Sequence, residues 1–560
     1  MPKSKKQTPT SSVPEKRSKR PVSHEIDYEE DAEDDEYEEE DDHMIILPNA
    51  DDSGDSDGAG SDEEDDDESF PSISYREAIN NYSEKQKKLE ESHEYSWIDG
   101  EKKYSNNFQN EILLTNAQKT KILECTPAEL FEIFFSINMK NHIIEATKEN
   151  GYDLSMHDLN TFIGIVIFSS FNKRKSQRDY WSHDLYLGEG VVSAAMTRNK
   201  FESIKSHLKY SKAAEQNPED RGWKVRFLLT EFRKNAQKFG FFETALSIDE
   251  MMAKSYHRTV LKQYIKGKPI RFGLKIWGLC TADGYLLDLD LYCGKNSAIG
   301  NDKLSNCALG SRVVMTLLQK LFFSTPFNKL HKYHLYFDNF FTSFDLELHL
   351  QKLGLRSTGT IRENRVKEKN FIDKKSTRGT YAVKHDKNSG INYITVMDSK
   401  QVSIASTAAG TTPLLPSQRY SSEQRAKIDI EMPNAFHLYN RYMGGVDLHD
   451  GHCNNVMPSI RSKKWTWVIF TRLIQSAIVN SVVLFNAANK GKKKGSKEFC
   501  LSLAKHYMEK GKMMRGKVHT FSHQKLKKSC SSESCSTRTQ IFCDDCNKFF
   551  CKPCSKKYHE

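Results

Sequence analysis

Apolar residues recur at helical spacing through the first hydrophobic part of the chain, residues 106–244. Thr126 followed by Pro127 is typical of a helix start, with an N-cap and then proline at the first helical position. The same spacing predicts further helices at 159–171, 201–210 and 225–239. We therefore expect a helical domain here.

The periodicity becomes strand-like at Leu246. In chain order it predicts strands at 246–249, 275–280 and 285–292, a helix at 309–323, a strand at 333–338, a helix at 344–353 and a strand at 357–362. Asp283-Gly284 supplies a hairpin turn between the second and third strands. The order βββαβαβ is that of the RNase H-like fold, in which the first and fourth strands of a mixed sheet are neighbours. We therefore predict an α/β catalytic core, the first part of which spans residues 245–362.

The rest of the chain divides by composition. A β-rich insertion is expected at 363–433, the second part of the core at 434–456 and the second part of the helical domain at 457–500, followed by a basic linker at 501–528 and a cysteine-rich module at 529–560. A long amphipathic helix is predicted from Lys464 to Ala488. Arg472 and Gln475 lie within it, which argues against membrane insertion, so we expect no membrane association.

Charge is distributed very unevenly along the 560 residues. The net charge is +8, from 83 basic and 75 acidic side chains, but residues 25–69 contain 25 acidic residues and no Lys or Arg. The remaining chain carries 83 basic and 50 acidic residues, a balance of +33, which points to nucleic acid as a partner. We expect residues 1–105 to be a disordered tail, first basic and then acidic. Its acidic block either shields the basic body, mimics nucleic acid, binds basic chromatin proteins or only keeps the chain soluble.

Localisation follows from the N-terminal sequence. The first residues lack an apolar core, so no secretory signal is expected. The basic stretch 15–21 is a candidate nuclear-localisation signal, and we expect the protein in the nucleus.

Acidic residues follow the predicted strands at two positions, Asp249 and Asp338. Because the first and fourth strands are expected to be neighbours, these carboxylates should converge. Asp447 and Asp450 lie three residues apart after two glycines and share one helix face. Carboxylate oxygens suit Mg²⁺, and two ions about 4 Å apart activate water and stabilise the leaving oxygen of a phosphodiester. Residues 249, 338, 447 and 450 are thus the predicted catalytic and Mg²⁺ (or Mn²⁺) ligands.

Basic residues near this predicted site are candidates for DNA phosphate contacts. Residues 262–271 lie between the first two strands, and 461–467 combine basic and aromatic side chains. A solvated hairpin is the alternative for the first stretch, and a core position is the alternative for Trp465. The predicted DNA-binding residues are Lys266, Lys268, Arg271, Lys275, Arg362, Arg365, Arg461, Lys463, Lys464 and Trp465.

Six of the 12 cysteines fall within the last 31 residues. The pairs 543/546 and 551/554 have zinc-ligand spacing, and interleaved pairs suggest a cross-brace that holds two Zn²⁺ ions. A chain this short would fold on its metal rather than on a core. Either His519 or His523 is a candidate for the missing eighth ligand. The predicted Zn²⁺ ligands are Cys530, Cys535, Cys543, Cys546, Cys551, Cys554 and His559.

Several motifs, in order, resemble the piggyBac transposase family. They are Ser247-Ile-Asp-Glu250, Arg271-Phe-Gly-Leu-Lys-Ile-Trp277, Phe337-Asp-Asn-Phe-Phe-Thr-Ser343, Gly359-Thr-Ile-Arg362 and Gly444-Gly-Val-Asp447. The resemblance implies a DDD/E-type DNA transposase that excises and integrates at TTAA sites through a hairpin intermediate. In this resemblance residues 249, 338 and 447 match the metal-binding aspartates, and Asp450 matches a fourth acidic position.

The same resemblance implies partners. In the family, a similar cysteine-rich module recognises the terminal inverted repeats of double-stranded DNA. Two element ends must be brought together, so we expect a homodimer. The alternative is a domesticated descendant that binds DNA without transposing. A chromatin-reading or ubiquitin-ligase protein that uses the cross-brace would leave the carboxylates unexplained.

Overall fold

The structure is a computed structural model. It describes residues 94–104, 108–184, 186–255, 257, 259–266, 268–294, 308–421, 424–489, 491, 493–514, 521–532, 535–544 and 548–559. The predictions made for residues 1–93, with their acidic block, lie outside the described residues, as do those for His519 and Cys546.

Helices make up the region between residues 116 and 236, as predicted. The Thr126 hydroxyl accepts the Glu129 N–H while the Glu129 carboxylate accepts the Thr126 N–H, and Pro127 occupies the first helical position. This capping box confirms the predicted helix start. The elements here are α2 (Asn116–Glu124), α3 (Pro127–Phe134), α4 (Ile137–Glu149), α5 (Met156–Phe171), η1 (Gln177–Trp181), α6 (Gly190–Ala195), α7 (Arg198–His207), η2 (Ala213–Glu215) and α8 (Trp223–Ala236).

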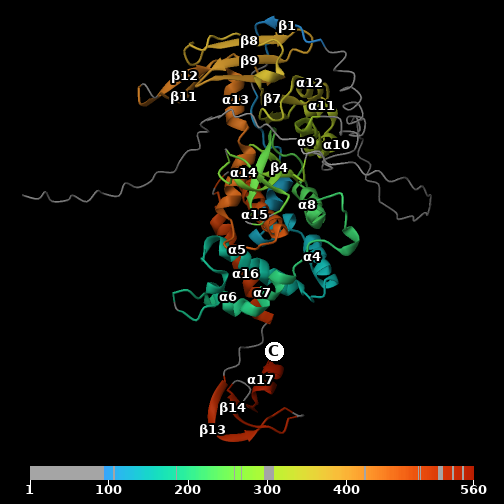
Figure 1. The fold of residues 1–560 in the computed structure, drawn as a ribbon, viewed down its shortest axis with the longest axis vertical. Coiled ribbons are helices and arrows are strands. Elements are labelled where there is room, and N and C mark those ends of the chain that lie inside the picture. Colours follow the sequence, from blue (N-terminus) through green and yellow to red (C-terminus); the bar gives the residue numbers. More distant parts are fainter. Residues whose placement is uncertain are drawn as a thin grey trace, which may run out of the picture. The chain divides into compact units, whose positions relative to one another are not determined.

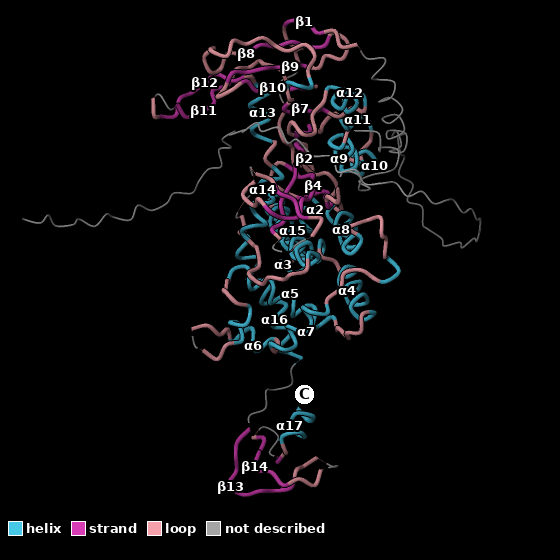
Figure 2. Tube along the Cα trace, in the orientation of Figure 1, coloured by secondary structure: helices cyan, strands magenta, loops and turns pink. Residues whose placement is uncertain are grey.

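The predicted strands lie in one large mixed sheet (Figures 1 and 2). They are β2 (Ala245–Lys254), β4 (Phe272–Thr281), β5 (Leu286–Leu291), β6 (His334–Phe337) and β7 (Arg356–Thr360), with a short β3 (Lys262–Tyr264) that was not predicted. Their order is β5–β4–β2–β6–β7, with β2, β6 and β7 parallel and β4 antiparallel to both neighbours. The predicted pairing of the first and fourth strands is therefore confirmed.

Helices between the strands follow the prediction with one break. The segment predicted as a single helix at 309–323 forms α9 (Leu309–Leu317) and α10 (Gln319–Ser324), and α11 (Phe327–Leu330) precedes β6. Helix α12 (Phe344–Lys352) connects β6 to β7. Helix α8 packs on β5, and α9 contacts both β4 and β5, so this end of the sheet is covered by helices.

The insertion extends the same sheet. Its strands are β8 (Tyr381–Asp386), β9 (Asn392–Met397) and β10 (Gln401–Ser406), after the short η4 (Glu363–Arg365). Strand β10 runs antiparallel to β7, with Ile404 opposite Thr360, so backbone hydrogen bonds join the insertion to the core. A separate two-stranded ribbon, β11 (Leu415–Ser421) and β12 (Ala426–Met432), leads into α13 (Asn434–Tyr442).

The predicted disordered tail, residues 1–105, includes residues that are folded in the structure. Strand β1 (Trp97–Asp99) pairs antiparallel with β8 at the edge of the sheet (Figure 1). The Trp97 ring lies 4.8 Å from that of Phe344 and 5.9 Å from that of Tyr393. These aromatic contacts bury apolar surface that composition averaged over the acidic segment conceals. Residues 94–104 thus belong to the folded part.

The predicted basic linker at 501–528 is also wrong over its first part. Helix α16 (Ser496–Met514) continues through it and packs along α5. Phe499, Leu503 and Tyr507 are buried at helical spacing, and Gly164 of α5 leaves room for Tyr507, whose Cβ would lie 2.8 Å from an added side chain. The final elements are β13 (Phe521–Ser529), β14 (Arg538–Cys543), β15 (Lys548–Phe549) and α17 (Lys552–His559), with the three strands forming a small sheet.

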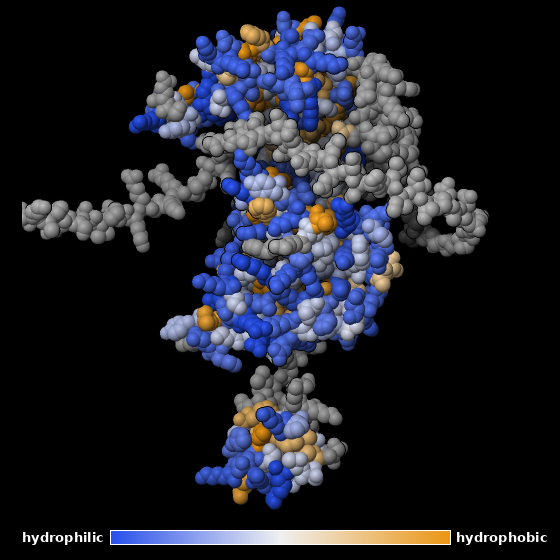
Figure 3. All heavy atoms as spheres, viewed as in Figure 1, coloured by the Kyte–Doolittle hydropathy of each residue, from blue (hydrophilic) through white to orange (hydrophobic). Residues whose placement is uncertain are grey.

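Helix α15 (Trp465–Ala488) runs through the centre of the hydrophobic core, next to α14 (Gly445–Asn455). Among the described residues it alone is long and apolar enough to cross a membrane, and 89% of its most apolar stretch is buried inside the protein. The face in Figure 3 is mostly hydrophilic, with scattered apolar side chains. The apolar character of α15 is thus accounted for by packing.

A buried carboxyl group lies where the segment before α2 meets β2. Glu243 is fully buried, forms an isolated bridge with Ile112 and accepts a 3.0 Å hydrogen bond from the Asn110 amide. Burial, with a smaller effect of the Asp283 charge, raises the pKa of Glu243 to about 7. The folded state therefore favours the protonated side chain at this junction.

We predict that Glu243→Gln removes a pH-dependent loss of stability. A carboxyl group whose pKa rises on folding contributes fully below its unfolded pKa, and the contribution is lost as pH rises through about 7. Relative to Glu243→Gln, the wild type should lose about 3 kcal/mol between pH 4.5 and pH 8. Unfolding temperatures measured at several pH values test this, with exposed Glu111→Gln as the control. Parallel pH profiles for wild type and Glu243→Gln would contradict it.

Candidate functional site

Two predicted aspartates meet where the parallel pairing of β2 and β6 ends. The last paired residues are Ile248 and Phe337, and Asp249 and Asp338 are the next residue on each strand. Because parallel strands run in register, the two carboxylates emerge at the same edge. Asp249 was predicted at a strand end, but β2 continues to Lys254 against β4. The pairing of β2 with β6 ends just before Asp249. The Asp249 side chain therefore lies beside the turn that carries Asp338.

Asp447 reaches this edge from the first turn of α14. The preceding Gly445 lies so close to the sheet that an added Cβ would be 2.2 Å from the Thr281 carbonyl oxygen and 2.6 Å from the Ser247 hydroxyl. Only glycine allows this approach, so Gly445 sets the distance between α14 and the sheet. Asp447 is 49% exposed, whereas the Asp249 side chain is almost fully buried.

A lysine ammonium group lies between the carboxylates. Lys268, from the loop between β3 and β4, donates to Asp249 Oδ2 at 2.8 Å and to Asp447 Oδ1 at 2.9 Å. We predicted Lys268 as a phosphate contact. The structure instead gives it two carboxylate partners, and this position depends on how the loop folds over the sheet.

The carboxylates lie in a strongly perturbed electrostatic environment. Burial raises the pKa of Asp249 well above its usual range, against the Lys268 charge and with Glu250, Asp338 and Asp447 adding to the rise. Burial and then the Glu250 charge raise the pKa of Asp338 to about 6, although the Phe340 N–H, 3.0 Å from Oδ1, opposes the shift. Several acidic groups so close together favour a bound cation.

Asp450 pairs with a different cation, Arg472. Its Oδ1 accepts a 2.8 Å hydrogen bond from Arg472 of α15, whose other terminal nitrogen donates to the Met252 carbonyl oxygen at 3.0 Å. Both side chains are buried, so the pair ties α14 and α15 to β2. His449 points the other way, toward the Gly284 carbonyl oxygen and the Ser476 hydroxyl, as the helical spacing predicted. The metal-ligand role of Asp450 stays a prediction.

The predicted DNA-binding residues separate into structural and exposed groups. Lys275 lies 4.0 Å from the Trp277 ring centre and pairs with Glu250 at 3.6 Å, inside the site. Arg362 donates to the Asn339 side chain, and Arg365 donates to the Asn339 and Thr342 carbonyl oxygens. The two arginines thus brace the turn that carries Asp338.

The remaining predicted contacts are closer to the surface. Lys266, Arg271, Arg461 and Lys463 are exposed, while Lys464 reaches the Ser206 carbonyl oxygen. Trp465 is half-buried against the hydrophobic core, which favours the core position over base stacking.

Four cysteines of the C-terminal module come together. The sulfur atoms of Cys530, Cys535, Cys551 and Cys554 all lie within 4.8 Å of one another. They are the first and third pairs of the predicted series, which is the interleaving that a cross-brace requires. Cys543 is buried on β14 outside this group. Cys546 and the His559 side chain lie outside what the structure describes.

Sequence reasoning missed the roles of three residues around the carboxylates. Glu250 adds negative charge next to Asp249, Lys268 bridges two carboxylates, and Arg472 anchors Asp450. The only sequence signal was an arginine within an otherwise apolar helix, which requires a buried acidic partner.

Known proteins resemble this chain over most of its length. Residues 126–482 match the family model described as Transposase IS4. Human PiggyBac transposable element-derived protein 3 is 30% identical over 462 residues, 78% of this chain and 76% of that protein. Human PiggyBac transposable element-derived protein 2 is 30% identical over 371 residues, 64% of this chain and 62% of that protein.

A solved structure has the same fold. The cryo-EM structure of the piggyBac transposase synaptic complex with hairpin DNA matches with a TM-score of 0.58 at 18% identity, and the match covers 77% of this chain and 96% of that one. The mixed α/β architecture with its large sheet is therefore shared. The family match over more than half of the chain, together with these relatives, shows that the chain belongs to the transposase family, in its piggyBac branch.

Proposed function

We propose that this protein is a metal-dependent DNA transposase of the piggyBac type. The observation that carries the proposal is the placement of three carboxylates at one edge of the sheet. Asp249 and Asp338 follow the last paired residues of β2 and β6, and Lys268 donates to both Asp249 and Asp447. Three carboxylates that come from three separate elements have the chemistry of a divalent-metal site.

The sheet supports an RNase H-like catalytic core. The strand order is β5–β4–β2–β6–β7. Strand β4 runs antiparallel to β5 and β2, and β2, β6 and β7 run parallel to one another. This arrangement fits the layout expected from the sequence. In that layout the catalytic carboxylates lie on the two central strands. The positions of Asp249 and Asp338 agree with it.

Asp249, Asp338 and Asp447 are the residues that would hold Mg²⁺ or Mn²⁺. When bound, such ions supply an activated water or hydroxyl and stabilise the leaving oxygen of a phosphodiester. Lys268 supplies positive charge to the same carboxylates, and its side chain is placed to contact a DNA phosphate when it leaves them. Arg362 and Arg365 hold the Asp338 turn, and Gly445 fixes the approach of Asp447.

DNA is the proposed substrate. The resemblance implies excision and integration at TTAA sites through a hairpin, and the matching solved structure is titled as a synaptic complex with hairpin DNA. The excess of basic residues outside 25–69 supports DNA binding, and a homodimer would bring two element ends together. The basic stretch 15–21 supports a nuclear location.

A second function deserves a direct test, because the human relatives are named as element-derived proteins. In this alternative the chain binds DNA without excising it. The three carboxylates at one sheet edge favour the active enzyme.

We predict that Asp249→Asn and Asp338→Asn each reduce excision to background. Each change removes a negative charge from the proposed metal ligands while keeping the shape of the side chain. The measurement is excision of a reporter element that carries the matching inverted repeats in cells. Asp373→Asn, an exposed acidic residue of the insertion, is the matched control and should excise normally.

Two outcomes would decide against this proposal in different ways. Equal excision by wild type and Asp249→Asn would remove the metal site from the mechanism. Repeat binding by a wild type that never excises would favour the DNA-binding alternative.

We further propose that the four-cysteine cluster binds one Zn²⁺ ion, and that Cys543 and Cys546 belong to a second site. Four thiolates within 4.8 Å suit tetrahedral zinc. Cys535→Ser and Cys546→Ser should each lower the zinc content of the purified protein by about one ion per chain. Elemental analysis measures this, with Cys125→Ser, outside the cluster, as the control. Full zinc content in Cys535→Ser would exclude the first site.

A further inference from the structure

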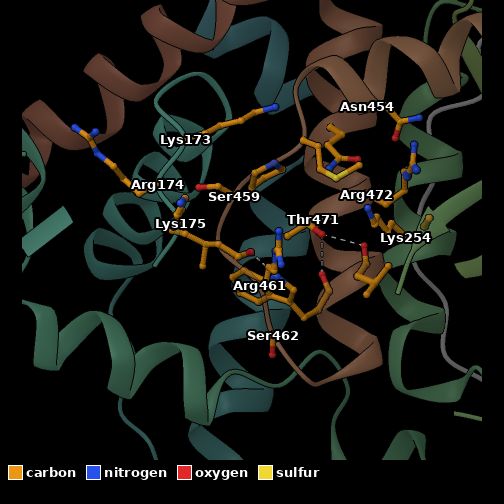
Figure 4. A pocket seen from close by; sticks show the side chains of 17 residues that line it. Lys173, Arg174, Lys175, Lys254, Asn454, Ser459, Arg461, Ser462, Thr471 and Arg472 are labelled. Carbon is orange, nitrogen blue, oxygen red and sulfur yellow. Dashed lines mark hydrogen bonds between the residues drawn. The ribbon is translucent and has the colours of Figure 1, made fainter. Parts of the chain in front are cut away.

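A basic cavity lies behind the carboxylate site, between the loop after α5, the end of β2, the loop before α15 and α15 itself. It encloses about 570 Å³, within the range of about 300–1,000 Å³ typical of ligand sites. Figure 4 shows side chains from these separate elements gathered around it. Its cationic lining residues are Lys173, Arg174, Lys175, Lys254, Arg461 and Arg472.

The lining has no acidic residue among the described side chains. Arg174 pairs with Glu189 and Arg472 with Asp450, and both carboxylates lie outside the lining. Lys173 and Lys175 are exposed. A lining with basic side chains and no acidic one among its described residues favours an anion as the ligand.

Two polar side chains of α15 form the buried wall of the cavity. Arg472 and Gln475 are 2% and 3% exposed. Arg472 donates to Asp450 and to the Met252 carbonyl oxygen, and a side-chain hydrogen bond also joins it to Cys453. Arg472 therefore contributes positive charge to this wall rather than an unpaired donor. Thr471 is already bonded to the Trp467 carbonyl oxygen, as drawn in Figure 4, and adds no free group.

The cavity is connected to the catalytic edge by β2. Ala253 and Lys254 line the cavity, five or fewer residues beyond Asp249 on the same strand, a distance of about 17 Å at most. Arg472 belongs to both places, because its guanidinium lines the cavity and binds Asp450 and the Met252 carbonyl oxygen. A polyanion that spans this distance would connect the cavity with the carboxylates.

We propose that this cavity is a phosphate-ester site that holds the backbone of a DNA strand whose neighbouring nucleotides extend toward the carboxylates. The role of the strand rests on the proposed function, whereas the phosphate chemistry rests on the cavity alone. A soluble polyphosphate or nucleotide has the same chemistry and is the other source of such a ligand.

The test is DNA binding by the full-length protein in EDTA, where no cleavage step takes part. Lys173→Ala/Lys175→Ala should lower the slope of log Kd against log salt by about 2, since about 0.9 is lost per phosphate contact. Lys374→Ala/Lys375→Ala removes the same charge from exposed lysines of the insertion and should keep the wild-type slope. Gln475→Leu alters the buried wall and should weaken binding several-fold.

A second arm uses sodium tripolyphosphate, with the unfolding temperature as the readout. A lowered salt slope in the Lys173/Lys175 variant assigns the cavity to DNA. An unchanged slope, with stabilisation by tripolyphosphate that this variant loses, assigns it to a soluble phosphate ester and overturns the DNA strand. If neither signal changes, the phosphate site itself is wrong. These binding measurements require no excision, so a failure of the catalytic proposal is detected separately, in the excision assay of wild type.

Discussion

The parallel pairing of β2 with β6 is the constraint on which the carboxylate site depends. It fixes Ile248 opposite Phe337 and therefore brings the next residue of each strand, Asp249 and Asp338, to one edge. A shift of one residue would turn one of these carboxylates to the other face of the sheet. The surrounding contacts maintain this arrangement, with Arg365 holding the turn after β6 and Gly445 admitting α14 against β2 and β4.

Much of this arrangement could be predicted because it follows from local patterns. Strand periodicity and chain order were enough to place Asp249 beside Asp338, and the capping sequence at Thr126 located a helix start. The cysteine spacings similarly predicted metal-ligand pairs, and the sulfur atoms of two pairs, 530/535 and 551/554, meet in the structure. In each case the relevant contact follows from a short segment or from a known strand order.

The remainder depends on contacts that no local pattern records. Lys268 reaches Asp249 and Asp447 only after a loop has folded over the sheet, and Arg472 finds Asp450 across two helices. Trp97 lies next to an acidic segment in sequence, but its burial comes from Phe344 and Tyr393, far along the chain. Average composition therefore assigned it to a tail, although its own contacts are those of a folded edge strand.

The union of β10 with β7 has a mechanical consequence. Backbone hydrogen bonds join β8–β10 of the insertion to the strands that carry Asp249 and Asp338. Together they form one continuous sheet from β1 to β3, with no flexible linker between its strands. Successive strand pairings connect Trp97 at the outer edge, through β8, β9, β10 and β7, to the edge that carries the aspartates. Strands β8, β9 and β10 of the insertion are therefore held in a fixed position relative to the strands that carry Asp249 and Asp338.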